Sequence, residues 1–196
     1  MKFEKFEDVV KFHGHVCPGL AFGYRVAKLA VEELNINRSE DEEIVCVVEN
    51  DSCAVDAIQV ITGCTFGKGN LIFKDYGKQV YTFFDRKNSK AIRIVIDFEF
   101  EETEEEKALW QKFISGDRSQ EVLEFIQKRK AEKTKKILEA PREEIFHITY
   151  PDFNPPRQAR IFKSLRCENC KEKVAETKGR ILNSKFLCIP CFEALL

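Results

Sequence analysis

Four cysteines near the C-terminus constrain this chain more than any other feature. Cys167 and Cys170 are separated by two residues, Cys188 and Cys191 repeat that spacing, and 17 residues lie between the pairs. Each short spacing lets two thiolates face one ion, and four thiolates complete the tetrahedral shell of a structural zinc. About 30 residues bury too little apolar surface to fold alone, so we expect residues 166–196 to fold around that zinc. Four sulfurs leave no open coordination position, so no chemistry is expected there.

The composition indicates a folded protein and argues against two classes of partner. The 196 residues are 43% hydrophobic and include 17 Phe, enough for one core and a small second module. The formal net charge is −1 and basic residues are interleaved with acids, so no nucleic-acid partner is expected. The sequence has neither a membrane span nor a secretory signal, which predicts a cytoplasmic protein without a membrane partner. There, eight cysteines are expected to bind metal or react rather than form disulfides.

The pattern of apolar residues divides the chain into three regions. Residues 1–100 predict a mixed helix and antiparallel-sheet (α+β) domain, residues 101–165 a charged helical and then extended linker, and residues 166–196 the zinc module. Within the first region we expect helices over 6–13, 18–35 and 50–63, with Phe3 near the apolar stripe of the first. We also expect a buried strand over 43–49. The runs at 71–76, 78–85 and 91–100 predict an antiparallel three-strand meander.

A second group of ligand-type residues lies in the segment HGHVCPG. His13, His15 and Cys17 occupy alternate positions directly before Pro18. A residue before proline avoids helical dihedrals, so Cys17 should cap the helix over 18–35, where the helix dipole favours a thiolate. In an extended segment the three side chains point to one side and can reach a single metal ion. The residue types are equally consistent with the absence of a metal site. One histidine would then lie in the core and the other on the surface, and the cysteine would be buried among apolar residues.

Two further cysteines flank the helix expected over 50–63. Cys53 lies near its start and Cys64 just after its end. Ten helical residues span roughly 15 Å, so the two thiols should not bind one ion. Cys53 is therefore the better partner for the HGHVC segment, and Cys64 would serve a second surface or a neighbouring subunit. Cys46 lies inside an apolar strand and is expected in the core.

Four polar residues have two interpretations each. Asp56 and Asn50 lie near the start of the Cys53 helix and either support metal ligands or cap the helix. Lys68, in the loop GCTFGKGN, is a candidate to bind an anion or cofactor with the loop amides. The alternative is a glycine-permitted turn, because the loop precedes a strand and phosphate-binding loops precede a helix. The isolated His147 is expected to be structural or on the surface.

Several segments together resemble a known family. FHGHVCPGLAFGYRVA, VENDSCAVDAIQVITGCTFGKGNL, GKQVYTFFDR and the four-cysteine module resemble the family of the E-type subunit of formylmethanofuran dehydrogenase, over nearly the whole chain. The resemblance implies an α+β domain related to the C-terminal domain of glyceraldehyde-3-phosphate dehydrogenase, a zinc-finger tail and a homodimer. It also implies association with the subunits of a molybdenum or tungsten oxidoreductase that reduces CO2 in methanogenesis. The family's motif positions include His13, His15, Cys17, Cys53 and Cys64, which favours a second metal site.

These observations lead to one expected function and two alternatives. The expected function is a zinc-containing, non-catalytic accessory subunit or relative of that enzyme. Its first domain would bind a second transition metal through Cys17 and Cys53 with His13 or His15. The first alternative is a stand-alone thiol enzyme with Cys17 or Cys53 as nucleophile and His15 as general base. The second is a dimeric interaction protein that recruits partners through its zinc finger and charged helix.

Overall fold

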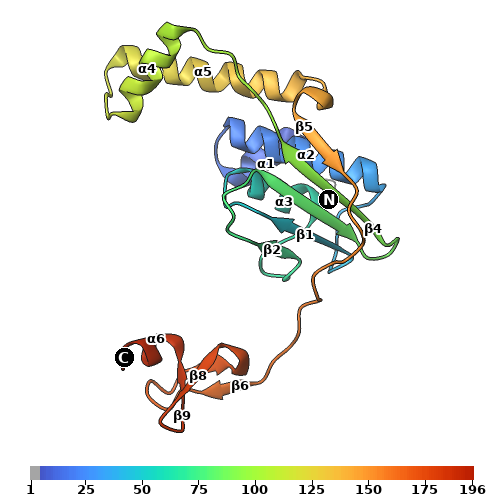
Figure 1. Ribbon diagram of the computed structural model, residues 1–196, viewed down its shortest axis with the longest axis vertical. Helices are drawn as coiled ribbons and strands as arrows, with labels where there is room; N and C mark the ends of the chain where they lie inside the picture. Colours follow the sequence, from blue (N-terminus) through green and yellow to red (C-terminus); the bar gives the residue numbers. More distant parts are fainter. Residues whose placement is uncertain (1–4) are drawn as a thin grey trace. The chain divides into compact units, whose positions relative to one another are not determined.

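A computed structural model describes residues 5–196 (Figure 1). Phe3, expected beside the first helix, lies outside the described residues. The chain separates into a first unit, residues 1–158, and a second unit, residues 159–196. The structure therefore assigns most of the expected linker, 101–158, to the first unit. Across the described part of the chain, no helix combines the length and apolar character that crossing a membrane requires.

A five-stranded mixed sheet forms the centre of the first unit. Its strands lie in the order β2-β1-β3-β4-β5, with bounds β1 Ile44–Val48, β2 Leu71–Phe73, β3 Val80–Asp85, β4 Lys90–Ile96 and β5 Phe146–Thr149. β1, β3, β4 and β5 pair antiparallel in that order, whereas β2 pairs parallel with β1. The predicted meander is therefore wrong in its first strand. The helix between β1 and β2 forms a crossover, which brings β2 back beside β1 in the same direction.

Three helices cover one face of this sheet: α1 Phe6–His13, α2 Pro18–Leu34 and α3 Ala54–Thr62. Side chains alternate along each strand, so Cys46, Tyr81 and Phe83 point into the main core against the helices. Cys46 is fully buried there, as expected. On the opposite face Val45 and Phe84 belong to a smaller apolar cluster. α3 ends at Gly63, as the sequence predicts, in the left-handed conformation with φ +74°.

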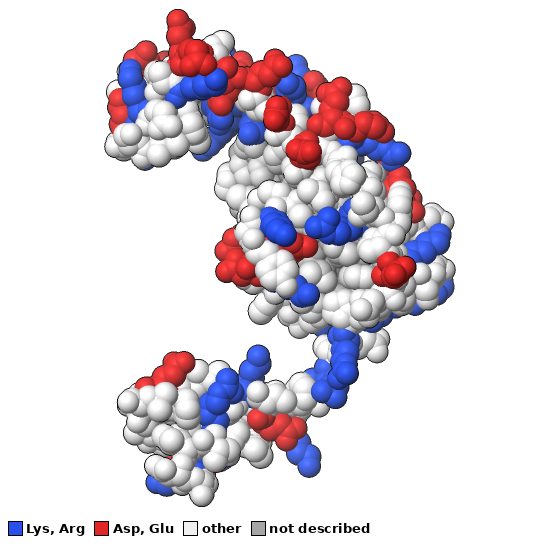
Figure 2. Space-filling model, in the orientation of Figure 1, with Lys and Arg blue, Asp and Glu red and all other residues white. Residues whose placement is uncertain are grey.

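Two further helices form a hairpin within the first unit, α4 Glu104–Ile114 and α5 Gln120–Glu139. Thr103 and Glu106 form a capping box at the start of α4. α5 packs on α2, where Arg25 donates hydrogen bonds of 2.7–3.0 Å to three carbonyls at the end of α5. Acidic and basic side chains are interleaved along the hairpin (Figure 2), so it presents no surface of a single charge in this view. The short 3-10 helix η1 Arg142–Glu144 then leads into β5, where His147 is exposed.

The second unit consists of two small hairpins and a closing helix. Its elements are β6 Ser164–Arg166, β7 Lys173–Ala175, the 3-10 helix η2 Glu176–Lys178, β8 Gly179–Leu182, β9 Lys185–Cys188 and α6 Ile189–Glu193. β6 pairs with β7 and β8 with β9, both antiparallel. Its buried apolar cluster contains Cys167, Leu187 and Cys188, with four partly buried residues around them. So small a core leaves the fold dependent on the cysteines.

Candidate metal centres

The four C-terminal cysteines meet at one point. Cys167, Cys170, Cys188 and Cys191 bring their sulfur atoms within 4.8 Å of one another. Cys167 begins the turn after β6, Cys188 ends β9, and Cys191 lies in α6, so strand ends and a helix supply the donors. Four sulfurs gathered around one point match the shell of a structural zinc.

A second cluster lies in the first unit and joins residues that are far apart in the chain. The ligand atoms of His13, His15, Cys17 and Cys53 also lie within 4.8 Å of one another. These side chains are not brought together by an extended segment before α2, as the sequence suggests. His13 ends α1, and Gly14 then takes the left-handed conformation, with φ +95°. That turn brings the two imidazole rings to a centroid separation of 4.4 Å.

Both thiols of this cluster lie at helix N-termini. Cys17 caps α2, as predicted, and its sulfur accepts a hydrogen bond of 3.3 Å from the backbone N–H of Leu20. Cys53 takes the cap position of α3 without a side-chain capping bond. Burial and a hydrogen bond with the Cys17 thiol raise the pKa of Cys53. In the absence of a cation, the Cys53 thiol therefore resists forming a thiolate beside Cys17.

Two glycines let the helices approach closely enough to bring these thiols together. A Cβ atom on Gly23 would lie 2.2 Å from the carbonyl oxygen of Ala54, and one on Gly19 would lie 3.3 Å from Cβ of Cys53. The two positions are one helical turn apart and so share one face of α2. Sequence reasoning missed this contact. The available signal was the four-residue spacing of the glycines in PGLAFG, directly after the cysteine.

His13 is held in an orientation suited to a metal ligand. Its Nδ1 lies 2.7 Å from Oδ2 of Asp56, while its Nε2 is buried and has no hydrogen-bond partner among the described residues. A carboxylate acceptor holds the imidazole proton on Nδ1 and leaves the lone pair of Nε2 free. An unpartnered buried lone pair beside two thiols fits a transition-metal ion. Asp56 thus orients a candidate ligand, the role that one of its two interpretations assigns to it.

The structure does not bring Cys64 to this cluster, which corrects its place among the candidate ligands. Cys64 is fully buried, and its thiol lies 3.5 Å from the carbonyl oxygen of Ile44. Burial raises the pKa of Cys64 to about 11. The helix length that separates it from Cys53 explains the outcome, and its burial also removes it from any surface of this chain.

Lys68 and Asn50 have structural partners. Nζ of Lys68 donates to the carbonyls of Ser39 and Glu40 at 3.0 and 3.2 Å, so the lysine ties two loops together. This contact favours the turn interpretation over the anion site. Oδ1 of Asn50 accepts hydrogen bonds from N–H and Oγ of Ser52 at 3.1 and 2.7 Å. Asn50 therefore orders the turn that precedes α3.

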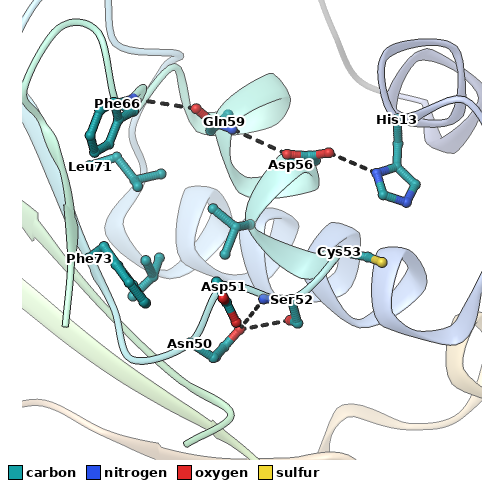
Figure 3. A pocket seen from close by; sticks show the side chains of 12 residues that line it. His13, Asn50, Asp51, Ser52, Cys53, Asp56, Gln59, Phe66, Leu71 and Phe73 are labelled. Carbon is teal, nitrogen blue, oxygen red and sulfur yellow. Dashed lines mark hydrogen bonds and ion pairs between the residues drawn. The ribbon is translucent and has the colours of Figure 1, made fainter. Parts of the chain in front are cut away.

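A pocket of about 350 Å³ adjoins the second cluster (Figure 3). His13, Cys53 and Asp56 lie on its wall together with residues from β1, the loop after α3 and β2. A chain of hydrogen bonds links the loop to the cluster. The N–H of Phe66 donates to Gln59 at 3.4 Å, and Gln59 donates to Asp56 at 3.4 Å. Two of the four candidate ligands, His13 and Cys53, therefore border a cavity of small-molecule size.

Asp56→Asn should weaken metal binding in the first unit by about 10- to 100-fold, because carboxylate partners of ligating histidines orient them and raise their basicity. The measurement is a competition titration of the full chain against a chelator of known affinity. Asp51→Asn is the matched control, since Asp51 is a neighbouring carboxylate outside the ligand cluster. Equal affinity in Asp56→Asn and the parent protein would remove Asp56 from the site.

An α+β unit with a two-histidine, two-cysteine cluster, followed by a four-cysteine module, defines a metal-binding protein with a zinc finger. Residues 160–195 match the family model "Prokaryotic dksA/traR C4-type zinc finger". Residues 12–147 match the model "FmdE, Molybdenum formylmethanofuran dehydrogenase operon". The chain belongs to the FmdE family, which confirms the resemblance that the sequence motifs indicate.

Two relatives extend this comparison. A solved structure of a tungsten formylmethanofuran dehydrogenase FmdE-like protein from Syntrophus aciditrophicus matches with a TM-score of 0.62 and 26% identity, covering 96% of this chain and 90% of that one. A protein of Archaeoglobus fulgidus described as a probable S-adenosyl-L-methionine-binding protein is 34% identical over 189 residues, or 92% of this chain. The chain spans 50% of that relative's length.

Proposed function

We propose that this zinc-finger protein of the FmdE family holds a second transition-metal ion in its first unit, on His13, His15, Cys17 and Cys53. The observation that carries the proposal is the buried, unpartnered Nε2 of His13. Asp56 fixes the proton on the far side of that ring, and two thiols and a second imidazole surround the lone pair. Nitrogen and sulfur donors favour zinc or a neighbouring transition metal over magnesium or calcium.

Three of the four donors are held in place and one is not. His13 is fixed by Asp56, Cys17 by the N–H of Leu20, and Cys53 by its position at the start of α3. His15 is exposed and has no hydrogen-bond partner among the described residues. His15 is therefore the ligand that an incoming small molecule would displace most easily. With that position open, the metal would act as a Lewis acid on the bound molecule.

The stand-alone thiol enzyme is the second candidate, and the pair of His13 and Asp56 is the observation in its favour. A thiol, an imidazole and a carboxylate could act together in nucleophilic catalysis, with His13 rather than His15 as the base. However, burial raises the pKa of Cys53, which opposes activation. A second thiol and a second imidazole have no role in such a triad, whereas both complete a tetrahedral metal shell.

The wider role follows from the family. We propose an accessory subunit or relative of a molybdenum or tungsten formylmethanofuran dehydrogenase, acting in the cytoplasm as a homodimer beside the other subunits. Membership of the FmdE family and the likeness to an FmdE-like structure support this role. The relation to the C-terminal domain of glyceraldehyde-3-phosphate dehydrogenase belongs to the same proposal, and a mixed sheet with helices packed on one face is compatible with it.

The double variant Cys17→Ser/Cys53→Ser of the full chain tests the proposed site. Elemental mass spectrometry should show a loss of one metal equivalent per chain, while the zinc finger keeps its own. Circular dichroism of the variant should retain the helical signal. Cys64→Ala is the control, because its thiol is buried away from the cluster, and it should keep the full metal content. Unchanged metal content in the double variant, with rapid iodoacetamide labelling of the parent protein, would support the thiol enzyme instead.

A further inference from the structure

The pocket beside the cluster combines apolar walls with exposed aromatic rings. Val48, Val55 and Leu71 contribute to its lining, and Phe73 and Phe66 lie at one side of it (Figure 3). The two phenylalanines are 43% and 77% exposed, although most large apolar residues of this unit are buried. Exposed rings that border one cavity are apolar surface available to a ligand.

The charged residues of the pocket have one sign. Two carboxylates, Asp51 and Asp56, line it, and its lining includes neither lysine nor arginine. Asp56 is engaged by His13 and Gln59. Asp51 has no hydrogen-bond or ion-pair partner in the part of the chain that the structure describes, and its oxygens remain free to accept. An anionic ligand would meet an uncompensated carboxylate here, whereas a cationic ligand would meet an acceptor.

We propose that this pocket binds a small organic cation, an ammonium group carried on an apolar or aromatic body. Asp51 accepts hydrogen bonds from the ammonium, and the rings of Phe66 and Phe73 receive the body and add a cation–π attraction. The pocket shares His13 and Cys53 with the proposed metal site. The inference therefore adds a class of ligand to the proposed metal site. Any reaction of the bound cation rests on the proposed function, whereas its binding does not.

Two probes of similar shape and opposite charge test the ligand class. The first is 2-phenylethylammonium and the second is 3-phenylpropanoate, each titrated into the full chain. Methyl NMR signals of Val48, Val55 and Leu71 report binding. We expect these signals to shift with the ammonium probe, and the carboxylate to bind at least about tenfold more weakly. Equal or tighter binding of the carboxylate would overturn the proposal.

Variants then locate the contacts. Asp51→Asn should weaken ammonium binding about tenfold because a charge-assisted hydrogen bond is lost. Phe73→Ala should weaken it about threefold. Asp117→Asn, in the loop between α4 and α5, is the control and should change nothing. An unchanged affinity in Asp51→Asn would overturn the proposed contact.

The metal-free double variant Cys17→Ser/Cys53→Ser separates this inference from the proposed function. Ammonium binding that persists in that variant supports the pocket independently of the metal. Loss of binding in that variant, together with undiminished binding in Asp51→Asn, would mean that the free amine ligates the metal. This result would overturn the proposal that the pocket binds the ammonium group, and it would support the metal site. A parent protein that contains only the zinc-finger metal but binds the ammonium would overturn the metal site alone.

Discussion

Removal of zinc from the second unit is expected to unfold residues 164–193 and to leave the first unit folded. The buried cluster of the second unit contains Cys167, Leu187 and Cys188, and two of these are themselves zinc ligands. Structural zinc contributes about 10–16 kcal/mol to the folding of small modules, far more than so small a core supplies. Cys188→Ser should therefore collapse the dispersed amide NMR signals of Val174 and Leu187, whereas signals from β3 and β4 should stay in place.

The control for this prediction is Lys185→Ala, an exposed position in the same strand as Cys188. It should keep the dispersed spectrum and the full metal content. If the signals of the second unit remained dispersed in Cys188→Ser, the unit would be held together by its hairpins alone. Zinc would then be an addition to the module rather than the cause of its fold.

Gly23→Ala should cause a large loss of stability in the first unit. The new Cβ would lie 2.2 Å from the carbonyl oxygen of Ala54 and 2.5 Å from its Cα, so backbone rather than a flexible side chain would have to move. Overpacking of this kind costs about 3 kcal/mol, which corresponds to a fall in Tm of about 10 °C for a unit of this size. Because α2 and α3 carry Cys17 and Cys53, the metal affinity of the first unit should fall as well.

Gly67→Ala is the matched control, since a Cβ atom there meets nothing within 4 Å. Its Tm should stay within a few degrees of the parent value, and its metal content should be unchanged. Thermal unfolding followed by circular dichroism, with metal analysis of the same samples, measures both effects. Equal Tm values for the two variants would show that the close contact of the helices is not needed for the fold.

Local signals allowed part of this fold and site to be predicted. Pro18 fixes the residue before it outside the helical region, which places Cys17 at the cap of α2. The sequence spacing of Cys167, Cys170, Cys188 and Cys191 is typical of a four-cysteine zinc site. The rise per residue of an α-helix was sufficient to predict that Cys64 and Cys53 lie too far apart to bind one ion. Each of these inferences depends on a few neighbouring residues.

The parts that could not be predicted depend on contacts between distant segments. β2 and β5 are short, and their places beside β1 and β4 are decided by which strand edges remain unpaired. The pairing of His13 with Asp56 joins residues 43 positions apart. Asp56 could be a helix cap or a ligand support on sequence grounds, and only the packing of α1 against α3 decides between them.

The count of transition-metal ions per full-length chain tests the central claim most directly. Elemental mass spectrometry of the purified protein, with chain concentration from amino-acid analysis, gives this ratio. We predict two ions per chain, one on the four cysteines of the second unit and one on the cluster of His13, His15, Cys17 and Cys53. A ratio of one that does not rise after incubation with excess zinc would contradict the metal site of the first unit.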